Sequence, residues 1–287
     1  MITIIISSED QVRLAAISLQ KATKDGITRH SVRLLLPIIG ATELDDWPGG
    51  ARQMMEAASP LVTDILKLQQ ISEKSDDEND GRRQISFMTI QESVIDQADG
   101  VRALFAQAND AKDDCCSILL PSGDTVMKLK EMDAQVGDKR NMILVNSQWR
   151  RKTDFGMAFF GGRDEKIRFV ERFVPTFHCS NSMVEGENVR ILRTYPGPWR
   201  VFLRVVKESG DVDWINIGEK PVLEEKTSQW EQSLKEMGGD TDGGRIFDYG
   251  IPTYKEVENM ISSREGYVPK SLSERAAAAL VFIKDTL

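Results

Sequence analysis

Short apolar runs alternate with helical patterns along the first half of this chain, and this alternation limits what the chain can fold into. The apolar runs have the length of strands and cover residues 31–36, 84–90, 116–120 and 142–146. Helical patterns precede and separate them, at 7–26, 51–69, 93–108 and 124–134. The runs are apolar on both faces, which is typical of a parallel sheet covered by helices.

The rhythm changes in the second half of the chain. Apolar runs at 173–179, 189–195, 199–206 and 212–217 follow one another with short turns and without helical patterns between them. Such a series predicts an antiparallel meander. We therefore predict an α/β fold: a Rossmann-like three-layer sandwich, with a mostly parallel sheet extended by C-terminal antiparallel strands.

Composition shifts along the chain suggest how it is divided. Residues 72–83, SEKSDDENDGRR, contain no apolar side chain and are predicted to be a disordered insertion. A glycine-rich joint spans residues 238–244, and two helical patterns follow it. We predict a single α/β domain over residues 1–237 and a helical C-terminal extension over residues 238–287.

The charge of the chain argues against one class of partner. The formal net charge is -8, whereas nucleic-acid binding needs a basic surface that displaces counterions. The middle of the chain is nevertheless locally basic, through Arg150, Arg151, Lys152, Arg163, Lys166 and Arg168. Two interpretations stay open: an ordinary solvated surface, or a docking face for an acidic partner or anionic lipid headgroups.

Cysteine and histidine usage points to no metal or cofactor. The three cysteines, Cys115, Cys116 and Cys179, form no disulfide framework and indicate a reducing compartment. The two histidines, His30 and His178, lie far apart in the sequence and form no clustered ligand set. We therefore predict no metal, no cofactor and no catalytic residues.

The sequence shows neither a signal peptide nor a membrane-spanning segment. The apolar start is too short for a signal peptide, and no apolar window is long enough to cross a bilayer. These observations predict a chain that is either cytoplasmic or already trimmed of a targeting segment.

One stretch resembles a phosphate-binding loop. No nucleotide-binding or nucleophile fingerprint occurs in the sequence. Trp47, Gly49 and Gly50 directly precede a helical pattern, whose first N–H groups could bind an anion. The alternative is an ordinary joint between a loop and a helix.

The stretch Tyr195-Pro196-Gly197-Pro198-Trp199 predicts a stiff turn between two strands. With Pro196 and Gly197 as central residues, the turn is expected to stay open, because Pro198 has no N–H to close it. Trp199 begins the next strand. It either fills the core or serves as an exposed anchor for a partner.

Three stretches together resemble a known family: residues 25–66, residues 143–149 (ILVNSQW) and residues 193–202 (RTYPGPWRVF). The family is a domain of unknown function found in chloroplasts and cyanobacteria, and it includes a low-photosystem-II-accumulation factor. The resemblance covers roughly residues 8–236 and carries no catalytic residues with it.

The resemblance implies a non-enzymatic assembly or interaction factor for photosystem complexes, in the chloroplast stroma or at the thylakoid. Its expected partners are photosystem or other thylakoid membrane proteins, together with anionic lipid. Binding would involve the Trp47 loop, the Tyr195–Trp199 turn and the basic residues Arg150, Arg151 and Lys152. The alternative is a Rossmann-like enzyme that binds a nucleotide or phosphorylated metabolite at the carboxyl ends of the parallel strands.

Overall fold

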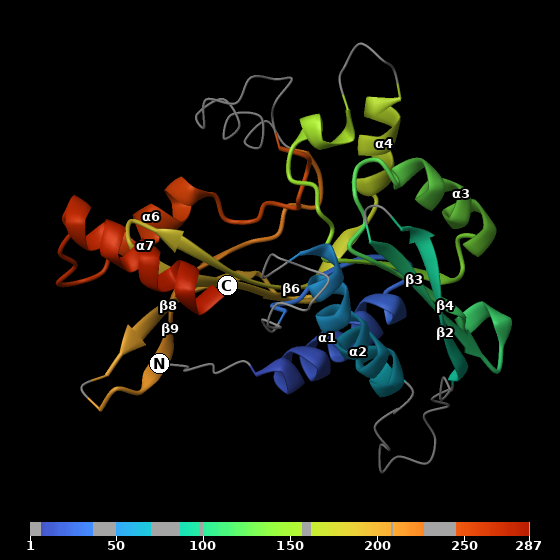
Figure 1. The fold of residues 1–287 in the computed structure, drawn as a ribbon, viewed down its shortest axis with the longest axis horizontal. Coiled ribbons are helices and arrows are strands. Elements are labelled where there is room, and N and C mark those ends of the chain that lie inside the picture. Colours follow the sequence, from blue (N-terminus) through green and yellow to red (C-terminus); the bar gives the residue numbers. More distant parts are fainter. Residues whose placement is uncertain are drawn as a thin grey trace.

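The computed structural model describes residues 7–36, 50–69, 87–97, 100–156, 162–207, 209–226 and 245–286. Within these ranges the chain forms one nine-stranded sheet with helices packed on it (Figure 1). The strands are β1 (Arg29–Arg33), β2 (Phe87–Asp96), β3 (Val101–Ala108), β4 (Cys115–Leu119), β5 (Asn141–Val145), β6 (Val174–Val184), β7 (Glu187–Thr194), β8 (Trp199–Val206) and β9 (Val212–Lys220). The α-helices are α1 (Ser8–Lys24), α2 (Ala51–Gln69), α3 (Val126–Val136), α4 (Arg163–Val170), α6 (Tyr254–Ser262) and α7 (Leu272–Thr286).

The sheet has a parallel centre and two antiparallel wings. Its strand order is β2-β3-β4-β5-β1-β6-β7-β8-β9. The pairs β4–β5, β5–β1 and β1–β6 are parallel, and the other five pairs are antiparallel. The predicted α/β class and the antiparallel meander of β6–β9 are confirmed. The prediction of a mostly parallel sheet is wrong, because antiparallel pairs are in the majority.

The missed antiparallel wing is the β2–β3 hairpin. We expected a helix over residues 93–108, whereas β2 and β3 pair along most of their length. Both faces of β3 are partly covered: Val101 and Ala103 are buried on one face, and Leu104, Ala106 and Ala108 are buried on the other. The sequence Asp-Gly at positions 99–100 is a common hairpin signal, and Gly100, which directly precedes β3, adopts a φ of 67°.

One face of the sheet packs against α1 and α2. Ser7 and Asp10 form a capping box at the start of α1, which explains why the helix begins there. Small and branched apolar side chains of both helices join the sheet in one buried cluster, including Ala15, Leu19, Val62, Leu66, Ile143 and Phe177. Figure 1 shows the two helices side by side on this face.

The opposite face carries two further clusters. Under α3 and α4, Leu129 and Phe169 pack with Ile118 and Leu144 of the sheet. Under α6, Val257 and Ile261 pack with strands of the second wing. Segment 245–252 also lies on this face, where its residues line a cavity together with residues of the sheet. No helix in the described part of the chain is both long and apolar enough to cross a membrane.

Several predicted features fall outside the described ranges. These are the insertion at residues 72–83, the glycine-rich joint at 238–244, and the site residues Trp47 and Gly49.

Candidate functional site

A cavity of about 350 Å³ lies on the α4 and α6 side of the sheet, where β1, β5 and β6 meet. Its polar side is formed by Arg33 at the end of β1, Arg150 after β5, and His178 and Ser180 of β6. Its apolar side includes Trp149, Phe173, Trp199 and Phe247. Arg33 and the residues that follow β5 place the cavity at the carboxyl ends of two parallel strands, where open α/β sheets commonly bind ligands.

Segment 245–252 is fixed over this cavity by hydrogen bonds. The indole Nε1 of Trp199 donates to the carbonyl oxygen of Tyr249 over 3.0 Å. The Tyr249 hydroxyl donates to the carbonyl oxygen of Glu171 over 3.0 Å, and the Phe247 amide donates to the Glu171 carboxylate over 3.0 Å. The cavity wall is therefore built from both the sheet and the C-terminal part of the chain.

Arg33 is a partly buried cation with few acceptors. One guanidinium nitrogen donates to the carbonyl oxygen of Ser147 over 2.7 Å. Burial, reinforced by the positive charge of Arg150, lowers the pKa of Arg33 to about 10. At neutral pH the group stays charged, and the surrounding protein does not favour that charge.

His178 lies directly opposite Arg33 in the β1–β6 pair. Its ring packs edge-on against Trp199, with centroids 5.2 Å apart, and its Nε2 lies 2.8 Å from the Ser180 hydroxyl oxygen. Burial first, and then the charges of Arg33 and Arg193, lower the pKa of His178 well below its ordinary value. The imidazole is therefore neutral at physiological pH and offers one donor and one acceptor.

Asp248 enters the cavity wall from the covering segment. One of its carboxyl oxygens is buried and has no hydrogen-bond partner among the described residues. Burial raises the pKa of Asp248 to about 7, although Arg245 and the amides of Ile251 and Gly250 oppose this shift. Near neutral pH the group is thus divided between its acid and carboxylate forms.

This arrangement is suited to binding a polar ligand. The cations can hold an oxyanion, His178 and Ser180 can donate or accept hydrogen bonds, and the aromatic side chains can cover an apolar body. His178 and Ser180 form one hydrogen-bonded pair, without a described carboxylate that would orient the imidazole as in a hydrolytic triad.

Two of the predicted site residues, Arg150 and Trp199, meet at this cavity. Trp199 is 1% exposed, so its side chain belongs to the core, and its indole N–H is used by the hydrogen bond to Tyr249. Burial at this level leaves no indole face free to serve as an exposed anchor.

The turn that contains Tyr195, Pro196 and Gly197 lies elsewhere and differs from the prediction. The Tyr195–Pro196 bond is cis, so the central residues are Tyr195 and Pro196, one position earlier than expected. The Gly197 amide closes the turn by donating to the carbonyl oxygen of Thr194 over 2.7 Å. The prediction of an open turn is therefore wrong. The Tyr195 hydroxyl donates to Asp25, which caps the end of α1.

The remaining predicted site residues are also separate from the cavity. Arg151 precedes a short 3-10 segment, Lys152–Phe155, and its amide donates to the Asp154 carboxylate over 2.8 Å. Gly50 precedes α2, and its carbonyl oxygen accepts from the Met54 amide over 2.9 Å.

Sequence reasoning missed Arg33, His178 and Asp248 as site residues. Arg33 carried a usable signal, because a cation within the apolar run Ser31–Leu36 must find acceptors or a ligand. His178 and Asp248 carry no comparable signal, because nothing in their local sequence marks them as residues of a ligand cavity.

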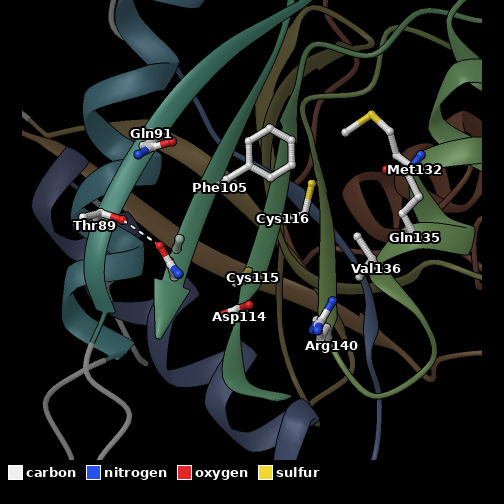
Figure 2. Close-up of a pocket in the computed structure, with 12 residues that line it drawn as sticks. Thr89, Gln91, Phe105, Asp114, Cys115, Cys116, Met132, Gln135, Val136 and Arg140 are labelled. Carbon is white, nitrogen blue, oxygen red and sulfur yellow. Dashed lines mark hydrogen bonds between the residues drawn. The ribbon is translucent and has the colours of Figure 1, made fainter. Parts of the chain in front are cut away.

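A second cavity of about 390 Å³ lies on the β2–β4 wing beside α3 (Figure 2). Phe105 and Cys116 form its sheet side, and Met132, Gln135 and Val136 face them from α3. Burial raises the pKa of the Cys116 thiol to about 12, so the thiol is not a nucleophile at neutral pH. The Arg140 guanidinium at its end donates to the carbonyl oxygen of Ala111 over 2.7 Å. This cavity therefore offers less polar chemistry than the first.

Comparison with known proteins identifies one family. A family described as a domain of unknown function (DUF1995) matches residues 6–225, which include β1, β5 and β6 and exclude the covering segment 245–252. No curated protein and no solved structure matches the chain.

Proposed function

Because the chain belongs to the DUF1995 family, we propose that it is an interaction or assembly factor for photosynthetic membrane complexes. Its place of action would be the chloroplast stroma or the stromal surface of the thylakoid, and its partners would be photosystem or other thylakoid membrane proteins. The compartment and the partner class rest on the resemblance of residues 25–66, 143–149 and 193–202 to plastid and cyanobacterial proteins.

The observation that carries an interaction role is the exposed apolar stripe of α7. Leu272 is 84% exposed and Leu280 is 71% exposed. Ala276 lies between them and is also exposed, so the three side chains follow one another at four-residue spacing along one side of the helix. Isolated exposed leucines are ordinary, but an aligned apolar stripe on a helix is the form in which helices enter grooves on partner proteins.

The contacts of α7 orient this stripe away from the sheet. Arg275 forms an ion pair with Glu185. Lys270, just before the helix, donates to the carbonyl oxygen of Gly186 over 2.8 Å. Both contacts reach the β6–β7 turn, and Figure 1 shows α7 at the outer end of the molecule. The stripe is therefore available to a groove on a partner without rearrangement of the sheet.

Co-sedimentation with isolated thylakoid membranes tests this proposal. We expect the wild-type chain to be retained and the double variant Leu272→Ser, Leu280→Ser to be retained severalfold less, because the apolar contact area is lost. Ala277→Ser is the matched control, since Ala277 is an exposed residue of the same helix beside the stripe. Equal retention of all three proteins, or retention of none, would rule out this docking mode.

A small-molecule role is the second candidate, and the cavity between β1, β5 and β6 favours it. A Rossmann-like three-layer arrangement would place a ligand at the carboxyl ends of the parallel strands. Arg33 at the end of β1 and Arg150 after β5 line the cavity at that position.

A further inference from the structure

We propose that the cavity between β1, β5 and β6 binds a small organic oxyanion, with its charged group held by Arg33 and Arg150 and its apolar body against the aromatic wall. This inference rests on the second candidate function, the small-molecule role of this cavity, and is independent of the proposed docking role of α7. It assigns the cavity a ligand class, a carboxylate or phosphate ester, from the charges and contacts of the described residues.

The first step is a comparison of two arginines on one strand. Arg29 and Arg33 are four residues apart in β1, so their side chains leave the same face of the sheet. Arg29 is fully supplied with acceptors. Its guanidinium contacts the Asp133 carboxylate and donates to the carbonyl oxygens of Gly137 and Arg140, both over 2.9 Å. Arg29 is thus a structural arginine, because acceptors of the protein itself use its guanidinium donors.

Arg33 lacks these acceptors. Among the described residues, its side chain donates one hydrogen bond, to the carbonyl oxygen of Ser147, and forms no ion pair. A guanidinium has five N–H donors, and those of Arg33 that do not reach Ser147 have no acceptor among the described residues. The free donors of Arg33 belong to a side chain that lines the cavity.

The second step concerns the sign of the charges around the cavity. Arg150 lines it and forms no ion pair among the described residues, and its charge acts on Arg33. Arg193 packs its guanidinium over Trp199, 5.5 Å from the ring centroid, and one of its buried nitrogens has no partner in the described part of the chain. Arg193 is not part of the cavity lining. Arg33 and Arg150 are, and neither forms an ion pair with a carboxylate of the described residues. A planar oxyanion would supply the missing acceptors and charge, and arginine binds such groups with two parallel hydrogen bonds.

The third step concerns the rest of the ligand. The cavity volume of about 350 Å³ lies within the range of small-molecule sites. Trp149, Phe173 and Phe247 offer apolar contact, which inorganic phosphate alone would not use. Asp248 and Arg245 of the covering segment also line the cavity. Arg245 pairs with Arg151 in an isolated β-bridge, so it lies next to Arg150 and adds a cation near it. A ligand with an anionic head and an aromatic or aliphatic body would contact both the arginines and the aromatic side chains of the cavity.

Calorimetric titration of the full chain with phenyl phosphate and benzoate tests the proposal. Inorganic phosphate tests binding of the anionic group alone, and neutral benzyl alcohol tests binding of the apolar ring alone. We expect at least one of the two aromatic anions to bind more tightly than either partial probe. Preference for phenyl phosphate would assign a phosphate ester, and preference for benzoate a carboxylate. Failure of both aromatic anions to bind would overturn the proposal.

Variants locate the site. Arg33→Gln should raise the dissociation constant of the bound anion at least tenfold, and Arg150→Gln should raise it by a smaller factor. Arg13→Gln, at an exposed position on α1 outside the cavity lining, is the matched control and should bind as the wild type does. Unchanged binding in both cavity variants would overturn the assignment.

A stability measurement separates ligand binding from a structural role of Arg33. If the cation serves a ligand, Arg33→Gln should leave the urea midpoint unchanged or raised, because the repulsion from Arg150 is relieved. A lowered midpoint together with unchanged anion binding in Arg150→Gln would show that Arg33 is structural. Arg150 is exposed, so Arg150→Gln is expected to fold normally. Its anion binding therefore tests the proposal even if Arg33→Gln does not fold.

Discussion

Asp248 is a residue whose charge the fold opposes. Its pKa of about 7 lies above the ordinary value of 3.8, chiefly because the carboxyl group is buried. The folded state therefore holds this proton more tightly than the unfolded chain does. As pH rises from about 4 to 7, the contribution of Asp248 to the free energy of unfolding falls, by about 1.4 kcal/mol per pH unit.

Asp248→Asn should remove this slope. We expect the variant to gain about 2–3 kcal/mol in free energy of unfolding relative to the wild type between pH 5 and pH 7, with no further gain above pH 8. Urea unfolding of both proteins at pH 5, 7 and 8 measures the difference. The opposite slope from His30, whose pKa burial lowers to about 4, is present in both proteins and cancels. A difference that stays constant across this range would contradict the pKa assigned to Asp248.

Trp199 links the core to the covering segment. Trp199→Ala should lower the free energy of unfolding by about 3–5 kcal/mol, because it leaves a large cavity and removes the bond to the Tyr249 carbonyl. Val206→Ala on the same strand is a control for the loss of apolar atoms, since Val206 is 56% exposed and should change stability by less than about 0.5 kcal/mol. Equal urea midpoints for the two variants would contradict the core role of Trp199.

Local sequence identified some of these residues and could not identify others. Trp199 was predictable, because it begins a strand with alternating apolar side chains. Arg33 was predictable in part, as a charge in an apolar run. Asp248 was not, because its burial depends on a segment that crosses the sheet after residues 227–244, and no local pattern encodes that path.

At the scale of elements, two loops approach so closely that only glycine fits between them. A Cβ atom on Gly123, in the turn between β4 and α3, would lie 1.7 Å from the carbonyl oxygen of Asp154. Lys166 of α4 completes this junction by donating to the carbonyl oxygen of Gly123 over 3.2 Å. The contact holds residues 150–155, and with them Arg150, against the β4–α3 turn.

Gly123→Ala should separate these loops. We expect a loss of about 1–3 kcal/mol or more in free energy of unfolding, because the obstructing atom belongs to the backbone and cannot rotate away. Thermal unfolding measures the loss. Asp124→Ala is the neighbouring control at an exposed position and should be close to wild type. Matching melting temperatures for the two variants would contradict the close approach of the loops.

Not all of the basic residues between positions 150 and 168 are available on the surface. Lys166 donates to two backbone carbonyl oxygens, and the Arg163 side chain is only 12% exposed. Arg151, just before the short 3-10 segment, and Arg168 on α4 remain exposed. A docking face for acidic partners or anionic lipid would therefore depend chiefly on these two residues, together with Arg150.

Charge reversal tests this face separately from the cavity. Arg151→Glu, Arg168→Glu should weaken co-sedimentation with thylakoids at low salt and have little effect at high salt, because exposed charges are screened beyond about 8 Å at physiological ionic strength. Lys112→Glu, at a distant exposed position on the β3–β4 connection, is the control. A salt-independent loss, or no loss at low salt, would contradict a role for this face.

At the scale of the whole molecule, the parallel centre of the sheet was predictable from the sequence. The proportion of parallel to antiparallel strand pairs was not. The apolar runs of β1, β4 and β5 are typical of strands covered on both faces, and all three lie in the centre. The first wing was missed because residues 93–108 contain alanine and glutamine, which fit a helix as well as a half-covered strand. Pairing partners decide between the two, and they are not visible in a local window.

The position of β1 also has a consequence for how the chain is made. It is the first strand in the sequence and lies in the middle of the sheet, where Arg29 pairs with Met142 and His30 pairs with Val174. During synthesis, both edges of β1 therefore stay open until more than a hundred further residues have emerged. Long-range pairing of this kind slows folding and leaves strand edges open to other chains. A ribosome-bound chain that ends before β6 should accordingly need a chaperone.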